Sequence, residues 1–152
     1  MNIVIVDYGM GNLFSVERAL QSIGVERPKT TSDPDRLAEA EFVILPGVGA
    51  FGDGMAGLTQ NGMADALRDH CNHGKPLLGI CLGMQMLVDA SEESPGVAGL
   101  GLIRGQVRRI ASTTENGGMR KVPYVGWAEM AVNPSWGGSD FAWPTEMIEG
   151  ES

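Results

Sequence analysis

Histidine, cysteine and long apolar stretches are scarce in this chain of 152 residues, and each shortage excludes a class of protein. Its two cysteines, Cys71 and Cys81, are too few for a disulfide framework. The apolar run at the amino terminus follows no basic segment and is broken by Asp7, which argues against a signal peptide or a membrane segment. We therefore expect a cytoplasmic protein whose thiols are both reduced.

Basic residues are scarce as well, since 11 Lys and Arg stand against 19 Asp and Glu and give a formal net charge of −8. An acidic chain needs a local basic cluster to bind nucleic acid or an anionic membrane. The candidate cluster consists of Arg104, Arg108, Arg109, Arg120 and Lys121. Arg104 and Arg108 share parity on an expected strand with no aromatic residue between them, which indicates a solvated strand face. We therefore expect neither a nucleic-acid partner nor a membrane partner.

Short apolar runs alternate with helical patterns over the first half of the chain. The runs within residues 2–7, 42–45 and 77–80 predict buried strands, with a weaker strand at 25–30. Helices are expected at 13–24, at 33–40 after an N-cap at Ser32, and at 61–74. This alternation predicts an α/β fold with a parallel sheet covered by helices on both faces. Further on, residues 102–110 and 119–122 flank a polar turn and predict a β-hairpin.

The strongest local pattern is Gly-Ile-Cys-Leu-Gly at residues 79–83, between an apolar strand and an expected helix at 84–88. A sharp strand-to-helix turn of this kind is a nucleophile elbow, which lifts its central side chain out of the sheet. The helix amino terminus there favours a thiolate, and the backbone N–H of Leu82 is the natural donor to an oxyanion. We expect Cys81 to be an exposed nucleophile; the alternative is a buried structural cysteine. Cys71 lacks such a setting and is expected in the core of its helix.

Two glycine motifs point to other functions, and both are weaker. Residues 47–52 match the G-x-G-x-x-G pattern of dinucleotide-binding proteins. However, Gly54 and Gly57 argue against a helix directly after this motif, and the strand before it is not the first. Gly74-Lys75 resembles the end of a phosphate-binding loop, but Pro76 stands where Ser or Thr is required. The sequence therefore predicts no cofactor and no metal.

Four segments, taken in order, resemble one family. They read DYGMGNLFSV from residue 7, LPGVGAFGDGM from 45, GKPLLGICLGMQ from 74 and KVPYVGW from 121. Over residues 1–127 the chain resembles the glutaminase subunits of imidazole glycerol phosphate synthase, which are class I glutamine amidotransferases. The resemblance implies flavodoxin-like layering that is incomplete at the carboxy-terminal side. It also implies hydrolysis of glutamine to glutamate and ammonia for a synthase (cyclase) subunit, the heterodimer partner in histidine biosynthesis.

The resemblance assigns roles to two residues of the expected elbow. Cys81 matches the nucleophile that attacks the glutamine amide, and Gln85 matches a residue that holds the glutamine substrate. Residues four apart lie on one face of a helix, so Gln85 is placed to reach a ligand attached to Cys81. Without the resemblance, Gln85 reads as an ordinary helix residue.

The loop at residues 46–49 matches the oxyanion strand of the family. In this match the backbone N–H of Val48 joins that of Leu82, while Gly47 and Gly49 allow the strand to reorient. By itself the loop reads as an ordinary turn.

Three more residues match positions near the interface with the synthase subunit. They are Asn12, Tyr124 and Trp127. Tyr124 stands where the family usually has histidine, which weakens that match. For Trp127 the alternative is an aromatic residue that packs in the core or the hairpin.

A cysteine amidohydrolase needs a base to form the thiolate and later to protonate the leaving ammonia. The family supplies a His and a Glu from a carboxy-terminal segment that reads roughly phenylalanine-histidine-proline-glutamate, and nothing after Trp127 resembles it. His70 and His73 end the helix before the nucleophile strand, on the opposite sheet edge from Cys81, and are expected on the solvated surface. We therefore expect impaired catalysis; a non-catalytic module that docks on the synthase subunit is the alternative. Another elbow-bearing cysteine hydrolase would need a downstream histidine that this sequence does not contain.

Residues 128–152 differ in character from the rest of the chain. They hold five acidic residues, no Lys or Arg, and aromatic residues without helical or alternating order. This composition predicts a loosely ordered tail after a single domain at residues 1–127. Without further strands, the sheet of that domain is expected to expose an apolar edge.

Overall fold

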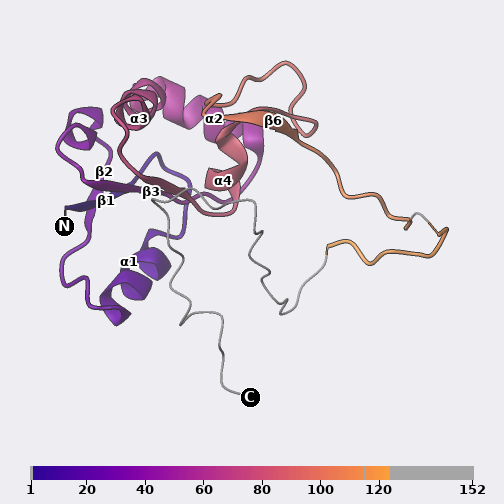
Figure 1. The fold of residues 1–152 in the computed structure, drawn as a ribbon, viewed down its shortest axis with the longest axis horizontal. Helices are drawn as coiled ribbons and strands as arrows, with labels where there is room; N and C mark the ends of the chain where they lie inside the picture. Colours follow the sequence, from indigo (N-terminus) through magenta and orange to yellow (C-terminus); the bar gives the residue numbers. More distant parts are fainter. Residues whose placement is uncertain (1, 115, 124–152) are drawn as a thin grey trace. The chain divides into compact units, whose positions relative to one another are not determined.

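The structure is a computed structural model that describes residues 2–114 and 116–123 (Figure 1). It divides into two compact units, residues 1–109 and 110–152. The boundary expected near residue 128 and the acidic tail lie outside the described residues.

A four-stranded parallel sheet forms the centre of the first unit. Its strands follow the order β2-β1-β3-β4. Their bounds are Ile3–Val6 for β1, Lys29–Thr31 for β2, Phe42–Leu45 for β3 and Leu77–Gly79 for β4. All three neighbouring pairs are parallel, with Val4 opposite both Lys29 and Val43. The predicted α/β fold with a parallel sheet is confirmed.

Helices cover both faces of this sheet, as Figure 1 shows, with α1 on one side and α2, α3 and α4 on the other. Alternate side chains of a strand point to opposite faces, so β1 contributes to two apolar clusters. Ile3 and Ile5 pack with Leu20 of α1 (Leu13–Ser22). The other cluster holds alternate residues of β1 and β3 together with residues of α2 (Phe51–Gln60), α3 (Met63–Asn72) and α4 (Leu82–Met86). β1 and β3 are therefore the buried centre of the fold.

The two outer strands are more exposed than the two inner ones. The residues of β2 are exposed or half-buried. Within the described residues β4 is the other edge of the sheet, and Leu78 on it is 47% exposed. The apolar edge that the sequence predicts is present there.

The structure corrects two expectations about helices in the first half of the chain. Asp33, not Ser32, caps the segment that follows β2: its Oδ1 accepts a hydrogen bond from Asp35 N at 3.1 Å. That segment is a single 3₁₀ turn, η1 (Pro34–Leu37), and does not extend to Ala40 as a helix.

The second correction concerns the helix that was not expected directly after residue 52. Helix α2 contains Gly54 and Gly57, and both lie where neighbouring segments pack closely against the helix. A Cβ on Gly54 would lie 2.7 Å from Met86 Sδ, and one on Gly57 would lie 3.1 Å from Tyr8 O. Tertiary packing here outweighs the low helix propensity of glycine. One of the two arguments against dinucleotide binding is thereby removed; β3 is still not the first strand.

The segment after the elbow also differs from expectation. Helix α4 ends at Met86, so Val88 begins a strand, β5 (Val88–Ser91), where a helix was expected. β6 (Ile103–Val107) pairs parallel with β5, not with residues 119–122, so the predicted hairpin is wrong. In the second unit a short turn is closed by a Thr113–Met119 antiparallel bridge. The expected solvated strand face is confirmed, since Arg104 and Arg108 are both exposed.

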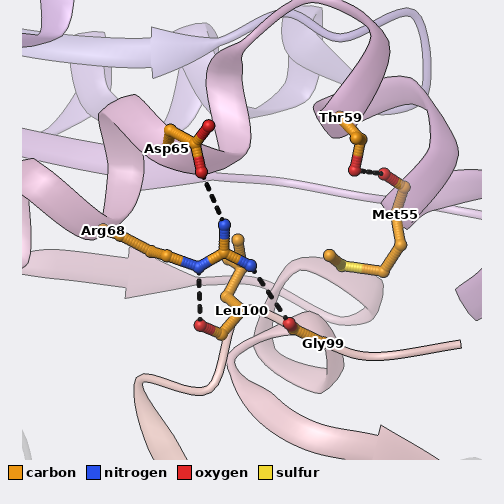
Figure 2. A network of polar contacts seen from close by, with 6 residues as sticks. All are labelled: Met55, Thr59, Asp65, Arg68, Gly99 and Leu100. Atoms are coloured by element: carbon orange, nitrogen blue, oxygen red, sulfur yellow. Dashed lines mark hydrogen bonds and ion pairs between the residues drawn. The ribbon is translucent and has the colours of Figure 1, made fainter.

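Arg68 on α3 ties this helix to the segment after β5 (Figure 2). Its Nε donates to Leu100 O at 3.0 Å, and its Nη2 donates to Gly99 O at 3.3 Å. Its Nη1 lies 2.8 Å from Asp65 Oδ1. The planar guanidinium thus serves two backbone carbonyls that would otherwise lack these donors.

Replacing Arg68 with lysine is expected to lower the free energy of unfolding by about 1–2 kcal/mol, because a single ammonium cannot serve both carbonyls in this geometry. Urea unfolding followed by circular dichroism measures the change. Asp65→Ala is the matched control, since it removes only the exposed ion pair and should cost less than about 0.5 kcal/mol. Equal losses of unfolding free energy in the two variants would show that the ion pair with Asp65, and not the hydrogen bonds to the two carbonyls, stabilises the fold.

Candidate active site

Cys81 lies in a sharp turn between β4 and α4, as the elbow pattern predicts. Its backbone has φ 55° and ψ −115°, and among the described residues it is the one non-glycine residue with positive φ. Such a conformation costs on the order of 1–3 kcal/mol and persists only where the surroundings impose it. The side chain of Cys81 is exposed, so the alternative of a buried structural cysteine is excluded.

The two glycines that flank the elbow are required by close packing. A Cβ on Gly79 would lie 2.6 Å from Met84 Cα. A Cβ on Gly83 would lie 1.8 Å from Leu45 O, inside any possible contact distance. The glycines therefore allow α4 to fold back directly against its own strand and against the end of β3.

The loop after β3 lies against this elbow. Ile80 N donates to Leu45 O at 2.9 Å, and Leu82 N donates to Gly47 O at 3.3 Å. A Cβ on Gly47 would lie 2.9 Å from Gly83 N, and Gly49 has φ +105°, which favours glycine. The structure thus places Gly47 beside Cys81 and Leu82, at the carboxyl edge of the sheet.

The hydrogen bond between Leu82 and Gly47 occupies one of the two expected oxyanion donors. In a trans peptide the C=O and N–H point in opposite directions. Because the Gly47 carbonyl points at Leu82 N, the N–H of Val48 in the same peptide unit points away from it. In this conformation the two N–H groups do not converge on one point.

Gln85 lies one turn after Cys81, and its backbone N donates to Cys81 O at 3.1 Å. It borders a groove of about 560 Å³. The other lining residues are Ser91, Glu92, Glu93, Val107, Arg108 and Arg109. The groove therefore carries charges of both signs, and its lining reaches Gln85 but not Cys81. No sequence pattern predicts this groove, because β5 and β6 were not expected to pair.

Two of the acidic residues in the groove already have backbone partners. Glu92 Oε2 accepts from Arg109 N at 3.0 Å. Glu93 Oε2 accepts from Phe51 N at 2.9 Å, at the start of α2. Ala50, the N-cap of α2, has no side chain that can accept a hydrogen bond. Glu93, from a distant segment, therefore provides the acceptor for a backbone N–H at the start of this helix.

Tyr8 is a site residue that sequence reasoning missed. It follows β1, is 5% exposed, and a Cβ on Gly47 would lie 2.4 Å from its hydroxyl oxygen. Burial, and secondarily the negative charge of Cys81, raise the pKa of Tyr8 to about 12. Only the adjacency of β1 and β3 brings this residue to the loop, so no local pattern could have revealed it.

The histidines lie away from Cys81, but His70 is not on the surface as expected. It is 4% exposed, with Nε2 3.0 Å from Pro76 O and Nδ1 3.4 Å from Leu37 O. His73 is exposed, and its Nδ1 lies 2.6 Å from Asp69 O. Both belong to the end of α3, which leads into the amino end of β4, whereas Cys81 follows the carboxyl end.

The position of His70 also changes the expectation for Cys71. The buried face of α3 runs through Ala64, Leu67 and His70, which leaves Cys71 half-buried and not in the core. Burial raises the pKa of the Cys71 thiol. Cys81 is therefore the more accessible of the two thiols.

Of the three expected interface residues, only Asn12 belongs to the described part of the chain. It is exposed, and its Oδ1 accepts a hydrogen bond from Ser15 N at 3.1 Å, so it caps α1. Tyr124 and Trp127 lie outside the described residues.

Comparison with known families places this elbow in a known class. Residues 4–134 match the family Glutamine amidotransferase class-I. The chain therefore belongs to the class I glutamine amidotransferases. In the described residues no helix has the length and apolar character needed to cross a membrane.

Within the class, the chain is similar to proteins described as imidazole glycerol phosphate synthase subunit HisH. It is 48% identical to that of Bacillus licheniformis over 130 residues, which cover 85% of this chain and 60% of the relative. It is 45% identical to that of Bacillus subtilis, with the same two coverages. The chain thus spans about three fifths of the length of the curated relatives it matches.

Solved structures agree with the fold. A crystal structure of a glutamine amidotransferase superposes with a TM-score of 0.61 and 25% identity, over 70% of this chain and 56% of that one. A putative peptidase E protein from Listeria monocytogenes superposes with a TM-score of 0.51 at 13% identity, over 66% of this chain and 62% of that one. The second likeness concerns the fold alone.

Proposed function

We propose that this chain carries the nucleophile of a glutaminase that hydrolyses glutamine to glutamate and ammonia for a synthase (cyclase) subunit, in cytoplasmic histidine biosynthesis. The observation that carries the proposal is the exposed thiol of Cys81 on a strained elbow, beside the loop of Gly47 to Gly49. The relatives described as imidazole glycerol phosphate synthase subunits support the choice of substrate and partner.

The chemistry begins at the thiolate of Cys81. It attacks the amide carbon of glutamine, a C–S bond forms, and the carbonyl electron pair moves onto the oxygen. When the pair returns, the C–N bond breaks and ammonia leaves with an added proton. Water then cleaves the thioester to give glutamate and to free the thiol.

The groove beside Gln85 suits the rest of the substrate. Glutamine carries an ammonium and a carboxylate on its α-carbon, so a groove with both acidic and arginine side chains can match both charges. The charged lining residues are Glu92 and Glu93, which follow β5, and Arg108 and Arg109, which follow β6. We assign substrate holding to this groove, with Gln85 at its border with the elbow.

Turnover by this chain is proposed to be impaired, because neither histidine lies beside Cys81 to serve as its base. His70 is buried against the amino end of β4, and His73 contacts Asp69 on α3. No other histidine occurs in the sequence. An oxyanion site and bound substrate alone leave roughly 10³–10⁴ of rate over water, far below that of a complete triad.

The test combines covalent labelling with turnover. The chloromethyl ketone analogue of glutamine should add once, at Cys81, with protection by excess glutamine, and should not label that position in Cys81→Ala. Steady-state glutaminase rates with added cyclase subunit should be equal, and near background, for the wild type and Cys81→Ala. Labelling that glutamine does not slow would contradict the assigned substrate, and a rate well above that of Cys81→Ala would contradict the impairment.

A non-catalytic docking module is the second candidate. Phe14 on α1, two residues after the interface candidate Asn12, is 72% exposed and so offers an apolar side chain to a partner surface. Co-elution of the purified chain with the cyclase subunit at micromolar concentration tests it. Separate elution would remove the support for any docking role.

A further inference from the structure

The hydroxyl of Tyr8 is buried without a hydrogen-bond partner. In the part of the chain that the structure describes, it is the one buried side-chain oxygen or nitrogen in this state. Leaving a buried hydroxyl unpaired costs free energy, and a phenylalanine in the same place would avoid that cost. A second conformation, in which the hydroxyl makes a hydrogen bond, would explain why tyrosine and not phenylalanine stands at this position.

The hydroxyl is held close to the loop after β3. A Cβ on Gly47 would lie 2.4 Å from it. Because a carbon–carbon bond adds about 1.5 Å, the hydroxyl lies within about 4 Å of Gly47 Cα. The ring is fixed by the core, where a Cβ on Gly57 would lie 3.2 Å from Tyr8 Cδ2. The packing of the ring in the core thus holds the hydroxyl beside the Gly47 peptide.

The same peptide blocks the oxyanion site. Its carbonyl accepts from Leu82 N at a long 3.3 Å, and its Val48 N–H points the other way. Rotation of this peptide frees Leu82 N–H and turns Val48 N–H toward the elbow. After rotation the Gly47 carbonyl needs a new donor, because a buried carbonyl without a partner is costly.

We propose that Tyr8 is a positioning residue for the oxyanion loop, whose hydroxyl donates to the Gly47 carbonyl after the Gly47–Val48 peptide rotates. The hydrogen bond stabilises the arrangement in which Val48 and Leu82 both donate to the substrate oxyanion. This inference rests on the proposed glutaminase function. Tyr8 acts through the loop and contacts neither the sulfur of Cys81 nor the substrate.

The charge state of Tyr8 fits the role. A donor must keep its proton while Cys81 is a thiolate, and the pKa of Tyr8, raised by burial and then by the charge of Cys81, is about 12. A pKa this far above neutrality keeps the Tyr8 hydroxyl protonated, and therefore a donor, at neutral pH.

Two thiol reagents distinguish a role of Tyr8 in positioning the oxyanion loop from a role in the fold alone. Iodoacetamide alkylates a thiolate by direct displacement and forms no oxyanion. The chloromethyl ketone analogue of glutamine passes through a tetrahedral adduct whose oxygen is negative, so it needs the oxyanion site; the thioether then forms and chloride leaves. Labelling rates at Cys81 are measured by peptide mapping in the wild type and Tyr8→Phe, and Cys71 is the reference thiol for iodoacetamide alone.

In Tyr8→Phe, labelling by the ketone is expected to slow about tenfold, which corresponds to roughly 1.4 kcal/mol. Labelling by iodoacetamide should stay within about twofold, and Tm should not fall, because the lost hydroxyl was unpaired. Equal ketone rates in the two proteins, or equal slowing with both reagents, overturn the role of Tyr8. Absence of glutamine-protected labelling in the wild type instead overturns the glutaminase proposal, so the two failures are distinguishable.

Discussion

Gly83→Ala is expected to destabilise the chain by about 3 kcal/mol or more, which is a large fraction of the unfolding free energy of an ordinary domain. The new Cβ would lie 1.8 Å from Leu45 O and 2.8 Å from Leu45 C. An ordinary carbon–oxygen contact is about 3.3 Å, so the end of β3 and the start of α4 must separate by more than an ångström. Such a shift also breaks the Ile80 N to Leu45 O hydrogen bond of 2.9 Å.

This outcome is opposite to the one that helix propensity predicts. Alanine in place of glycine inside an exposed helix stabilises it by about 1 kcal/mol. Gly11→Ala is the matched control, since a Cβ there would lie 3.4 Å from Pro46 Cγ, an ordinary contact. Urea unfolding followed by far-UV circular dichroism compares the three proteins. A Gly83→Ala protein as stable as Gly11→Ala would show that the elbow and β3 are not packed as described.

Phe51→Ala is expected to cost about 3–5 kcal/mol of unfolding free energy. The side chain is fully buried at the first position of α2, in the same cluster as Leu82 and Met86 of α4. Removing it leaves a cavity in the apolar cluster that also supports α4. Because Phe51 N also donates to Glu93 Oε2, the groove beside Gln85 is expected to loosen together with the core.

Phe14→Ala gives a control with the same chemical change. Phe14 is 72% exposed on α1, so its removal should alter the free energy of unfolding by less than about 0.5 kcal/mol. Urea unfolding measures the stability of both variants. The rate at which iodoacetamide labels Cys81 in the folded protein reports whether the elbow has changed. Comparable losses of stability in the two variants would contradict the assignment of Phe51 to the core.

The parts of the fold that could be predicted from the sequence are those fixed by local pattern. β1 and β3 are continuous apolar runs, so their bounds agree with expectation to within a residue or two. Helix α2 and the β5–β6 pair could not be predicted. Gly54 and Gly57 contradict helix propensity and are explained only by the neighbours they touch, and parallel pairing across a connection leaves no local signal.

The candidate site likewise has a part that could be predicted from local sequence and a part that could not. The elbow at Cys81 was predictable, because its glycines and its position between strand and helix are visible in five consecutive residues. Tyr8 and Glu93 were not, since each reaches the site through the packing of distant segments. The histidines show the converse: a polar residue near a helix end reads as solvated, yet His70 finds two backbone carbonyls in the interior.

The steric origin of the elbow glycines has a consequence for how this motif survives in evolution. Gly79 and Gly83 are required by contacts with Met84 and Leu45, whether or not the thiol between them reacts. Selection for a folded domain alone would therefore preserve most of the motif in descendants that have lost turnover. A glycine-flanked cysteine at this position is evidence of ancestry and architecture, and the competence of each member must be judged by whether a proton acceptor reaches its sulfur.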